Sequence, residues 1–256
     1  MAEFLLTERR DNGVELIRLN RPPMNALSAE LLGELADHVE ALAGDAGLKA
    51  VVLTGSDRVF AAGAEISQIQ GETERLLGSF RRAFDGLAAI PRPVIAAVSG
   101  FALGGGLEAA LACDLRLASE NARLGVPEID LGVFPGAGGT QRLPRLVGAA
   151  KAKEMLWTGR HVPAGEALAM GLVDRVVPVE GYLDAALDWA ASFARGAVVA
   201  MGLSKRAVDG GLDGSLAEGL DLERTLFGRV IATEDAATGI ASFFQNGPGK
   251  AVFSGR

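Results

Sequence analysis

The hydrophobic positions in the first 120 residues predict strands and helices in turn. Asp11-Asn12-Gly13 separates two apolar runs, and Asn-Gly between such runs is a strong signal for a β-hairpin. Later apolar runs are continuous rather than alternating, which is typical of buried parallel strands. The expected strands are Phe4–Arg9, Val14–Leu19, Lys49–Gly55, Val94–Val98 and Asp114–Ser119.

Between these strands the apolar residues recur at helical spacing, which predicts helices. The first expected helix is Ser28–Ala43, in which Ser28 is a candidate N-cap. The second covers residues 72–90 and is stopped by Pro91 and Pro93, and the third is Leu107–Cys113. A strand, helix, strand rhythm of this kind predicts parallel βαβ units, so we expect an α/β fold.

After about residue 140 the pattern becomes helical almost throughout. Only Val173–Val177 has the pattern of a strand there. We therefore expect an α/β core over residues 1–190 and a helical region over 191–256, with no linker between them. The expected helices are Leu146–Thr158, Ala164–Met170, Tyr182–Ala194, Ala197–Asp209, Ser215–Ile231 and Glu234–Phe244.

Composition narrows the class of protein. Hydrophobic residues make up 49% and charged residues 22% of the 256 residues, which is ordinary for a globular protein. The net charge of −7 disfavours a general attraction to nucleic acid or to anionic lipid. Cys113 is the single cysteine, and His38 and His161 are the only histidines. A site for a soft metal ion therefore has too few ligands.

The expected location is the cytoplasm. The N-terminal residues lack the basic start and apolar stretch of a signal peptide. No uninterrupted apolar run reaches the ~18 residues of a membrane span. We therefore expect a soluble protein with no membrane partner.

Generic catalytic motifs are mostly missing from the sequence. It contains no Walker phosphate loop, no G-x-G-x-x-G fingerprint and no G-x-S-x-G elbow. His38 falls inside an amphipathic helix and His161 in a turn, so a Ser–His–Asp triad lacks a plausible base.

Three glycine-rich segments are better candidates for chemistry. They are Phe60–Ile66, Gly104–Glu108 and Gly125–Leu143. The first two present backbone N–H groups at a turn or a helix start, where an anion is favoured. The alternative interpretation is close packing of backbone against backbone.

Glu108 and Glu128 lie in otherwise apolar stretches. A carboxylate in such a place is costly to desolvate unless it has a partner. Two carboxylates that face one small volume would shift each other's proton affinities and could exchange protons with a substrate. The alternative is two unrelated glutamates at helix ends or in salt bridges, and sequence separation alone does not show that they meet.

These segments, with others in the same order, resemble the crotonase (enoyl-CoA hydratase/isomerase) superfamily over nearly the whole chain. The resemblance implies a crotonase-like ββα spiral core with a C-terminal helical trimerisation region. The motifs that carry it are Asn20–Leu27, Phe60–Ile66, Gly104–Glu108, Gly136–Leu143, Leu156–Arg160 and Ala167–Val177.

The resemblance also implies an activity, the syn addition of water across the trans-2 double bond of an enoyl-CoA to give a 3-hydroxyacyl-CoA. Glu108 and Glu128, 20 residues apart, match the two glutamates of hydratases. The N–H groups of Ala64 and Gly105 match an oxyanion hole, where each lost donor costs roughly 10²–10³ in rate. The implied substrate and CoA contacts are Ala26, Ala62, Glu65, Ile66, Ser67, Gly136 and Lys250.

The resemblance implies no metal and no redox cofactor, because coenzyme A enters as part of the substrate. It implies a homo-oligomer, a trimer or a dimer of trimers, in which Phe243 and Lys250 reach a neighbouring subunit's CoA. Residues 21–27, Arg-Pro-Pro-Met-Asn-Ala-Leu, are shorter than the segment of many short-chain hydratases and are more like isomerases. The alternative activity is therefore a Δ3,Δ2-enoyl-CoA isomerase or other enolate chemistry on an acyl-CoA.

Overall fold

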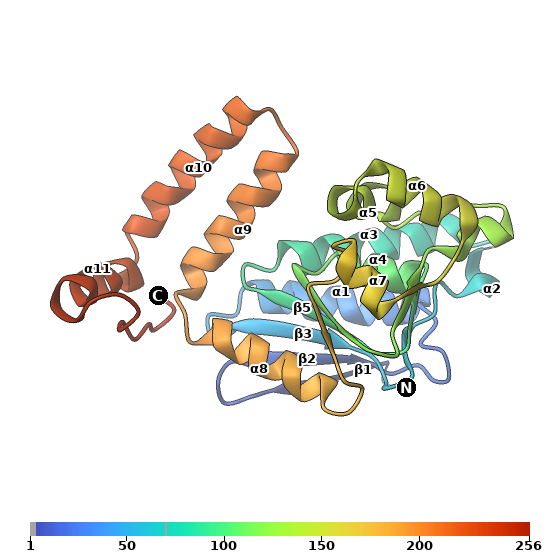
Figure 1. The fold of residues 1–256 in the computed structure, drawn as a ribbon, viewed down its shortest axis with the longest axis horizontal. Coiled ribbons are helices and arrows are strands. Elements are labelled where there is room, and N and C mark those ends of the chain that lie inside the picture. Colours follow the sequence, from blue (N-terminus) through green and yellow to red (C-terminus); the bar gives the residue numbers. More distant parts are fainter. Residues whose placement is uncertain (1–3, 70) are drawn as a thin grey trace.

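The computed structural model describes residues 4–69 and 71–256, whose strands form two β-sheets. Strands of the larger sheet are labelled in Figure 1. The larger has the strand order β1-β2-β3-β5-β7-β10; β1 is antiparallel to β2 and the other pairs are parallel. The smaller has the order β4-β6-β8-β9, with β9 antiparallel. The strands are β1 (Leu5–Arg9), β2 (Val14–Leu19), β3 (Ala50–Thr54), β4 (Val59–Ala61), β5 (Val94–Val98), β6 (Phe101–Leu103), β7 (Leu115–Ser119), β8 (Arg123–Gly125), β9 (Val162–Pro163) and β10 (Arg175–Val177).

The larger sheet is covered on both faces, which is why its two middle strands, β3 and β5, are almost entirely apolar. In β3, Val51 and Leu53 belong to the main core with α1 and α3, whereas Val52 belongs to a second cluster under α8. Successive strand residues point to opposite faces, so a strand between two helical layers needs apolar residues at every position. The predicted parallel α/β sheet is confirmed.

Helices pack around the sheets, and the last three, α9 to α11, extend away from them (Figure 1). Helix α1 begins after Ser28, whose hydroxyl accepts a hydrogen bond from the backbone N–H of Leu31 at 3.3 Å, so the predicted N-cap is confirmed. The helices are α1 (Ala29–Ala43), α2 (Ile66–Ile69), α3 (Thr73–Ala89), α4 (Gly105–Leu111), α5 (Gly139–Val147), α6 (Ala149–Thr158), α7 (Ala164–Ala169), α8 (Tyr182–Ala194), α9 (Val198–Leu212), α10 (Leu216–Ile231), α11 (Glu234–Asn246) and a 3-10 helix, η1 (Pro127–Leu131).

Two details differ from the sequence-based prediction. The single helix expected at Leu146–Thr158 is wrong, because α5 ends at Val147 and α6 begins at Ala149. Gly148 between them has a φ of 81°, which breaks the helical path. The smaller sheet was not expected, because its strands of two or three residues are too short to show a periodicity.

Helices α9, α10 and α11 form an arm that projects from the sheets (Figure 1). The arm is tied to the core by Lys205, whose ammonium donates to the Ile90 carbonyl and to Asp114, both at 3.0 Å. The predicted boundary at residue 190 falls inside α8, and the division into two domains stays a prediction. The arm exposes many large apolar side chains, among them Val208, Leu212, Leu216, Leu220, Phe227, Ile231, Ile240, Phe243 and Phe244.

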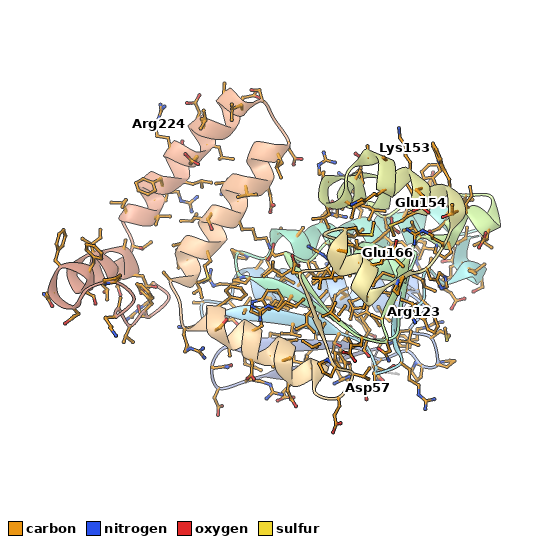
Figure 2. All side chains as sticks on the ribbon, viewed as in Figure 1. Asp57, Arg123, Lys153, Glu154, Glu166 and Arg224 are labelled. Atoms are coloured by element: carbon orange, nitrogen blue, oxygen red, sulfur yellow. The ribbon has the colours of Figure 1, made fainter. Side chains whose placement is uncertain are left out.

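Helices α6 and α7 are joined by one cation. Figure 2 shows Glu154 and Glu166 on these helices, and Arg160 pairs with each of them at 2.6 Å. This pairing links α6 to α7 across the turn between them. None of the helices in residues 4–69 and 71–256 is long and apolar enough to cross a membrane.

Candidate active site

The loop after β4 brings Ala64 beside the N-terminal segment. Leu27 uses both of its backbone groups here, donating to the Gly63 carbonyl at 2.8 Å and accepting from the N–H of Glu65 at 3.0 Å. In a parallel bridge of this kind the residue between the two partners turns its own N–H the other way. The N–H of Ala64 therefore points away from Leu27.

The turn before α4 adjoins this loop. A Cβ on Gly104 would lie 3.7 Å from the Cα of Gly63. Gly104 has φ 52° and ψ −126°, a conformation that favours glycine, and Gly105 begins α4 immediately after it. Because the first N–H groups of a helix have no partner within the helix, Gly105 presents a donor at this turn.

Gly106 has a different reason to be glycine. A Cβ there would overlap the Ala61 carbonyl, so α4 can start against β4 only without a side chain at this position. Close packing, one of the two interpretations of the glycine run, is therefore confirmed for Gly106, and ligand binding by the backbone of Gly105 stays a prediction.

Glu108 lies in the first turn of α4 and is only 2% exposed. Its Oε1 atom accepts hydrogen bonds from the N–H of Ala137 and of Gly139, both at 2.7 Å. The pKa of the Glu108 carboxyl is raised, chiefly by burial, and these two donors and the charge of Arg142 offset only part of the rise. The two donors favour the ionised form of Glu108.

Glu128 lies on η1 and is held differently. Its Oε2 atom is buried and has no hydrogen-bond partner among the residues that the structure describes. Burial, followed by repulsion from Glu108, raises the pKa of Glu128 to about 7, and its own backbone N–H opposes the rise. At neutral pH this carboxyl therefore carries a proton much of the time.

The structure brings the two glutamates to one place, which the sequence could not show. A Cβ on Gly104 would lie 2.6 Å from Oε1 of Glu128, and the Gly104 carbonyl accepts from the N–H of Glu108 at 3.0 Å. The carboxyl group of Glu128 and the backbone of Glu108 therefore both lie at the start of α4, and the charge of Glu108 acts on Glu128. Two carboxyl groups whose surroundings differ in this way can differ in proton affinity.

The residues expected to contact CoA lie along two adjacent loops. The N–H of Ala62 donates to the Met24 carbonyl at 3.0 Å, and Arg21 bridges the loops by donating to the Ala26 carbonyl and pairing with Glu65 at 2.7 Å. Ile66 and Ser67 are exposed at the end of this strip. The Ser67 hydroxyl, then Arg21, holds the pKa of Glu65 below its usual value.

Gly136 and Lys250 lie in different parts of the chain. Gly136 directly precedes the donor Ala137, and a Cβ on it would lie 3.2 Å from the side chain of Leu77. Lys250 and Phe243 belong to the arm and its tail, and α11 lies at the opposite end of the molecule from α2 (Figure 1). Within one chain they are not brought to the glutamates.

The sequence-based reasoning missed the residues that hold Glu108. Ala137, Gly139 and Arg142 lie in a segment whose pattern was noted, but no local signal shows that its N–H groups meet a carboxylate 29 to 31 residues earlier. No cluster of three or more His, Cys, Asp or Glu suited to a metal occurs in residues 4–69 and 71–256.

Known proteins resemble this chain closely. Residues 9–255 match the family described as Enoyl-CoA hydratase/isomerase. A protein of Rhizobium meliloti named "Probable enoyl-CoA hydratase" is 47% identical over 94% of this chain and 95% of its own length. The short-chain-enoyl-CoA hydratase of Clostridium acetobutylicum is 40% identical over 92% of this chain and 93% of its own. The crystal structure of the enoyl-CoA hydratase from Bacillus anthracis superposes with a TM-score of 0.93 at 37% identity, covering 99% of this chain and 100% of that chain.

Proposed function

Because the chain belongs to the enoyl-CoA hydratase/isomerase family, we propose that it is an enoyl-CoA hydratase, a lyase that acts in fatty-acid β-oxidation or related acyl-CoA catabolism. It adds water syn across the trans-2 double bond of an enoyl-CoA and gives a 3-hydroxyacyl-CoA. The observation that carries the proposal is the pair Glu108 and Glu128, which meet at one turn with unequal hydrogen bonding.

The two carboxyl groups differ in their hydrogen-bond partners, and this difference suits hydration, which needs one proton acceptor and one proton donor. Glu108, whose Oε1 atom accepts two N–H hydrogen bonds that stabilise its ionised form, accepts a proton from the water whose oxygen attacks C3. Glu128, with its raised pKa, gives a proton to C2. The C2–C3 π bond is consumed, one C–O and one C–H bond form, and a proton passing from Glu108 to Glu128 through solvent resets the pair.

The thioester carbonyl takes up negative charge while C3 is attacked. In this proposal the N–H groups of Ala64 and Gly105 hold that oxygen as an oxyanion hole, supported by the direction of the first and the helix-start position of the second. Because the thioester itself accepts the electron pair, the reaction needs no metal or redox cofactor, and CoA enters with the substrate.

The two loops that contain Ala26 and residues 62–67 are proposed to hold the CoA portion of the substrate. The proposed contacts are Ala26, Ala62, Glu65, Ile66 and Ser67. The support for them is the arrangement of the two loops, which Arg21 ties together. Gly136 adjoins the donors to Glu108 and is proposed to lie beside the acyl end.

We propose that the chain works as a trimer or a dimer of trimers. The apolar side chains exposed along the arm, such as Phe227 and Ile231, are more than a lone protein normally leaves in water. In such an assembly Phe243 and Lys250 reach the CoA of a neighbouring subunit. Light scattering at micromolar concentration should give the mass of a trimer or hexamer, and a stable monomer would contradict the assembly. A cytoplasmic location and the lack of nucleic-acid binding stay predictions.

The activity is tested with Glu108→Gln and Glu128→Gln, which keep the shape of each side chain and remove proton exchange. Each variant should lose most of its kcat for crotonyl-CoA hydration with KM little changed, and the two losses should not multiply in the double variant. A matched control is Glu180→Gln, an exposed glutamate before α8. If the parent barely hydrates crotonyl-CoA, and Glu108→Gln isomerises a 3-enoyl-CoA at the parent rate, the enzyme is an isomerase.

A further inference from the structure

Arg142 lies on the first turn of α5 and reaches back to the turn that holds Glu108. Its Nη1 atom donates to the Ala137 carbonyl at 3.1 Å, and its Nη2 atom donates to Oδ1 of Asp85 on α3 at 3.0 Å. The Arg142 side chain is 25% exposed, whereas that of Asp85 is 58% exposed. Arg142 thus links α3 to the backbone of residues 137–139.

The position of the Ala137 carbonyl sets the orientation of the peptides on either side of it. This carbonyl belongs to the peptide between Ala137 and Gly138, which is flanked by the two peptides whose N–H groups bind Oε1 of Glu108. Gly138 has a φ of 111°, and a Cβ on it would overlap Nη1 of Arg142. The turn therefore takes its shape from a glycine and from the guanidinium that fills the space beside it.

From this geometry we infer that Arg142, held by Asp85, is a positioning residue for Glu108. It fixes the peptide between Ala137 and Gly138, aims both neighbouring N–H groups at one carboxylate oxygen, and so favours the ionised form of Glu108. This inference rests on the proposed hydratase function and adds to it a residue that touches no reacting atom.

The charges around Glu108 support the assignment. Arg142 lowers the pKa of Glu108 against the larger effect of burial, and the charge of Glu108 in turn raises the pKa of the neighbouring Glu128. Strands β4 and β6, which pack against α4, carry no titratable side chain. The other cation of α5, Arg145, donates to the Gln141 carbonyl and lies 3.9 Å from Asp213 instead.

A purely structural role would give a different result. If Arg142 only joined α5 to α3, its loss would lower stability and leave the protonation of the glutamates unchanged. If it acts through Glu108, its loss makes Glu108 harder to ionise, because one or both N–H groups no longer point at Oε1. The low-pH limb of the rate profile, which reports a base losing its proton, then moves to higher pH.

The test uses the full-length oligomer and crotonyl-CoA. Arg142→Gln should lower kcat about 10- to 100-fold with KM little changed, and should displace the low-pH limb upward. Asp85→Asn, at an exposed position that the fold tolerates, should give a smaller effect in the same direction. Arg142→Lys should recover part of kcat, and Arg145→Gln, the matched control on the same helix, should behave as the parent.

The decisive measurement is a double variant. In the Glu108→Gln background, Arg142→Gln should lower kcat by less than twofold, because the group through which it acts is already removed. Multiplying losses, or a lowered kcat with an unmoved pH limb, would overturn the inference, and so would a full kcat in Arg142→Gln. A parent that does not hydrate crotonyl-CoA would instead overturn the proposed function, whatever Arg142 does.

Discussion

Glu128 should make the folded protein less stable as the pH rises. Its pKa is raised from 4.5 to about 7 in the folded state, chiefly by burial. The folded protein then holds a proton that the unfolded chain releases at lower pH. The stability linked to that proton is complete below pH 4.5 and is lost as the pH rises through about 7. Glu128→Gln removes this loss, because an amide does not ionise.

The size of the effect follows from the two pKa values. Each pH unit between them corresponds to about 1.4 kcal/mol, so a fully buried carboxyl would account for about 3 kcal/mol. Glu128 as a residue is only half-buried, and solvent screens part of its charge. We therefore expect Glu128→Gln to gain about 1–2 kcal/mol relative to the parent between pH 5 and pH 9.

The assay is urea unfolding of parent and variant at pH 5 and pH 9, at one fixed protomer concentration because the protein is expected to be an oligomer. The amide shifts stability by some amount that does not depend on pH, so only the change between the two pH values is compared. Glu180→Gln, on the surface, serves as the control and should show no such change. The same Glu128 variant should lose hydration activity, so a gain in stability at high pH accompanies a loss of function.

A difference in unfolding free energy that is the same at pH 5 and pH 9 would refute the reasoning. So would a variant that loses stability relative to the parent as the pH rises. The first result would mean that Glu128 ionises near its ordinary pKa, and the second that its pKa is lowered in the folded protein. In either case Glu128 is not the proton donor of the pair.

Two further predictions concern the candidate site, and a third concerns the buried Arg116 of β7. Gly104→Ala forces a side chain into a positive-φ turn and against Glu128, so urea unfolding should show a loss of about 1–3 kcal/mol and the hydration assay a large fall in kcat. Ala64→Pro removes an N–H donor and should lower kcat by about 10²–10³, whereas Ala64→Gly should keep most activity; a folded, fully active proline variant would contradict the oxyanion hole. Arg116→Met removes a buried guanidinium that donates to the Leu172, Ala110 and Cys113 carbonyls and should cost about 3 kcal/mol in unfolding free energy. Arg123→Met on the surface should change it by less than about 0.5 kcal/mol.

The sequence by itself determined the local elements of this protein. The Asn-Gly hairpin, the N-cap at Ser28 and the apolar strand at residues 50–54 are confirmed, because each depends on residues within one turn or one strand. The order of the motifs also determined the family. The break at Gly148 was missed, since a glycine there is visible in the sequence but its positive φ is not.

Only the tertiary structure decided how the glutamates are held. Glu108 and Glu128 meet because β6 and β8 pair side by side and place the segments after them at one edge of the smaller sheet. The difference in their hydrogen bonding comes from the N–H groups of residues 137 and 139, which belong to another segment and bind only Glu108. Hydrophobic periodicity reports which face of an element is buried, whereas a proton donor and a proton acceptor are defined by neighbours far along the chain. The candidate residues could therefore be found in the sequence, and the division of labour between them could not.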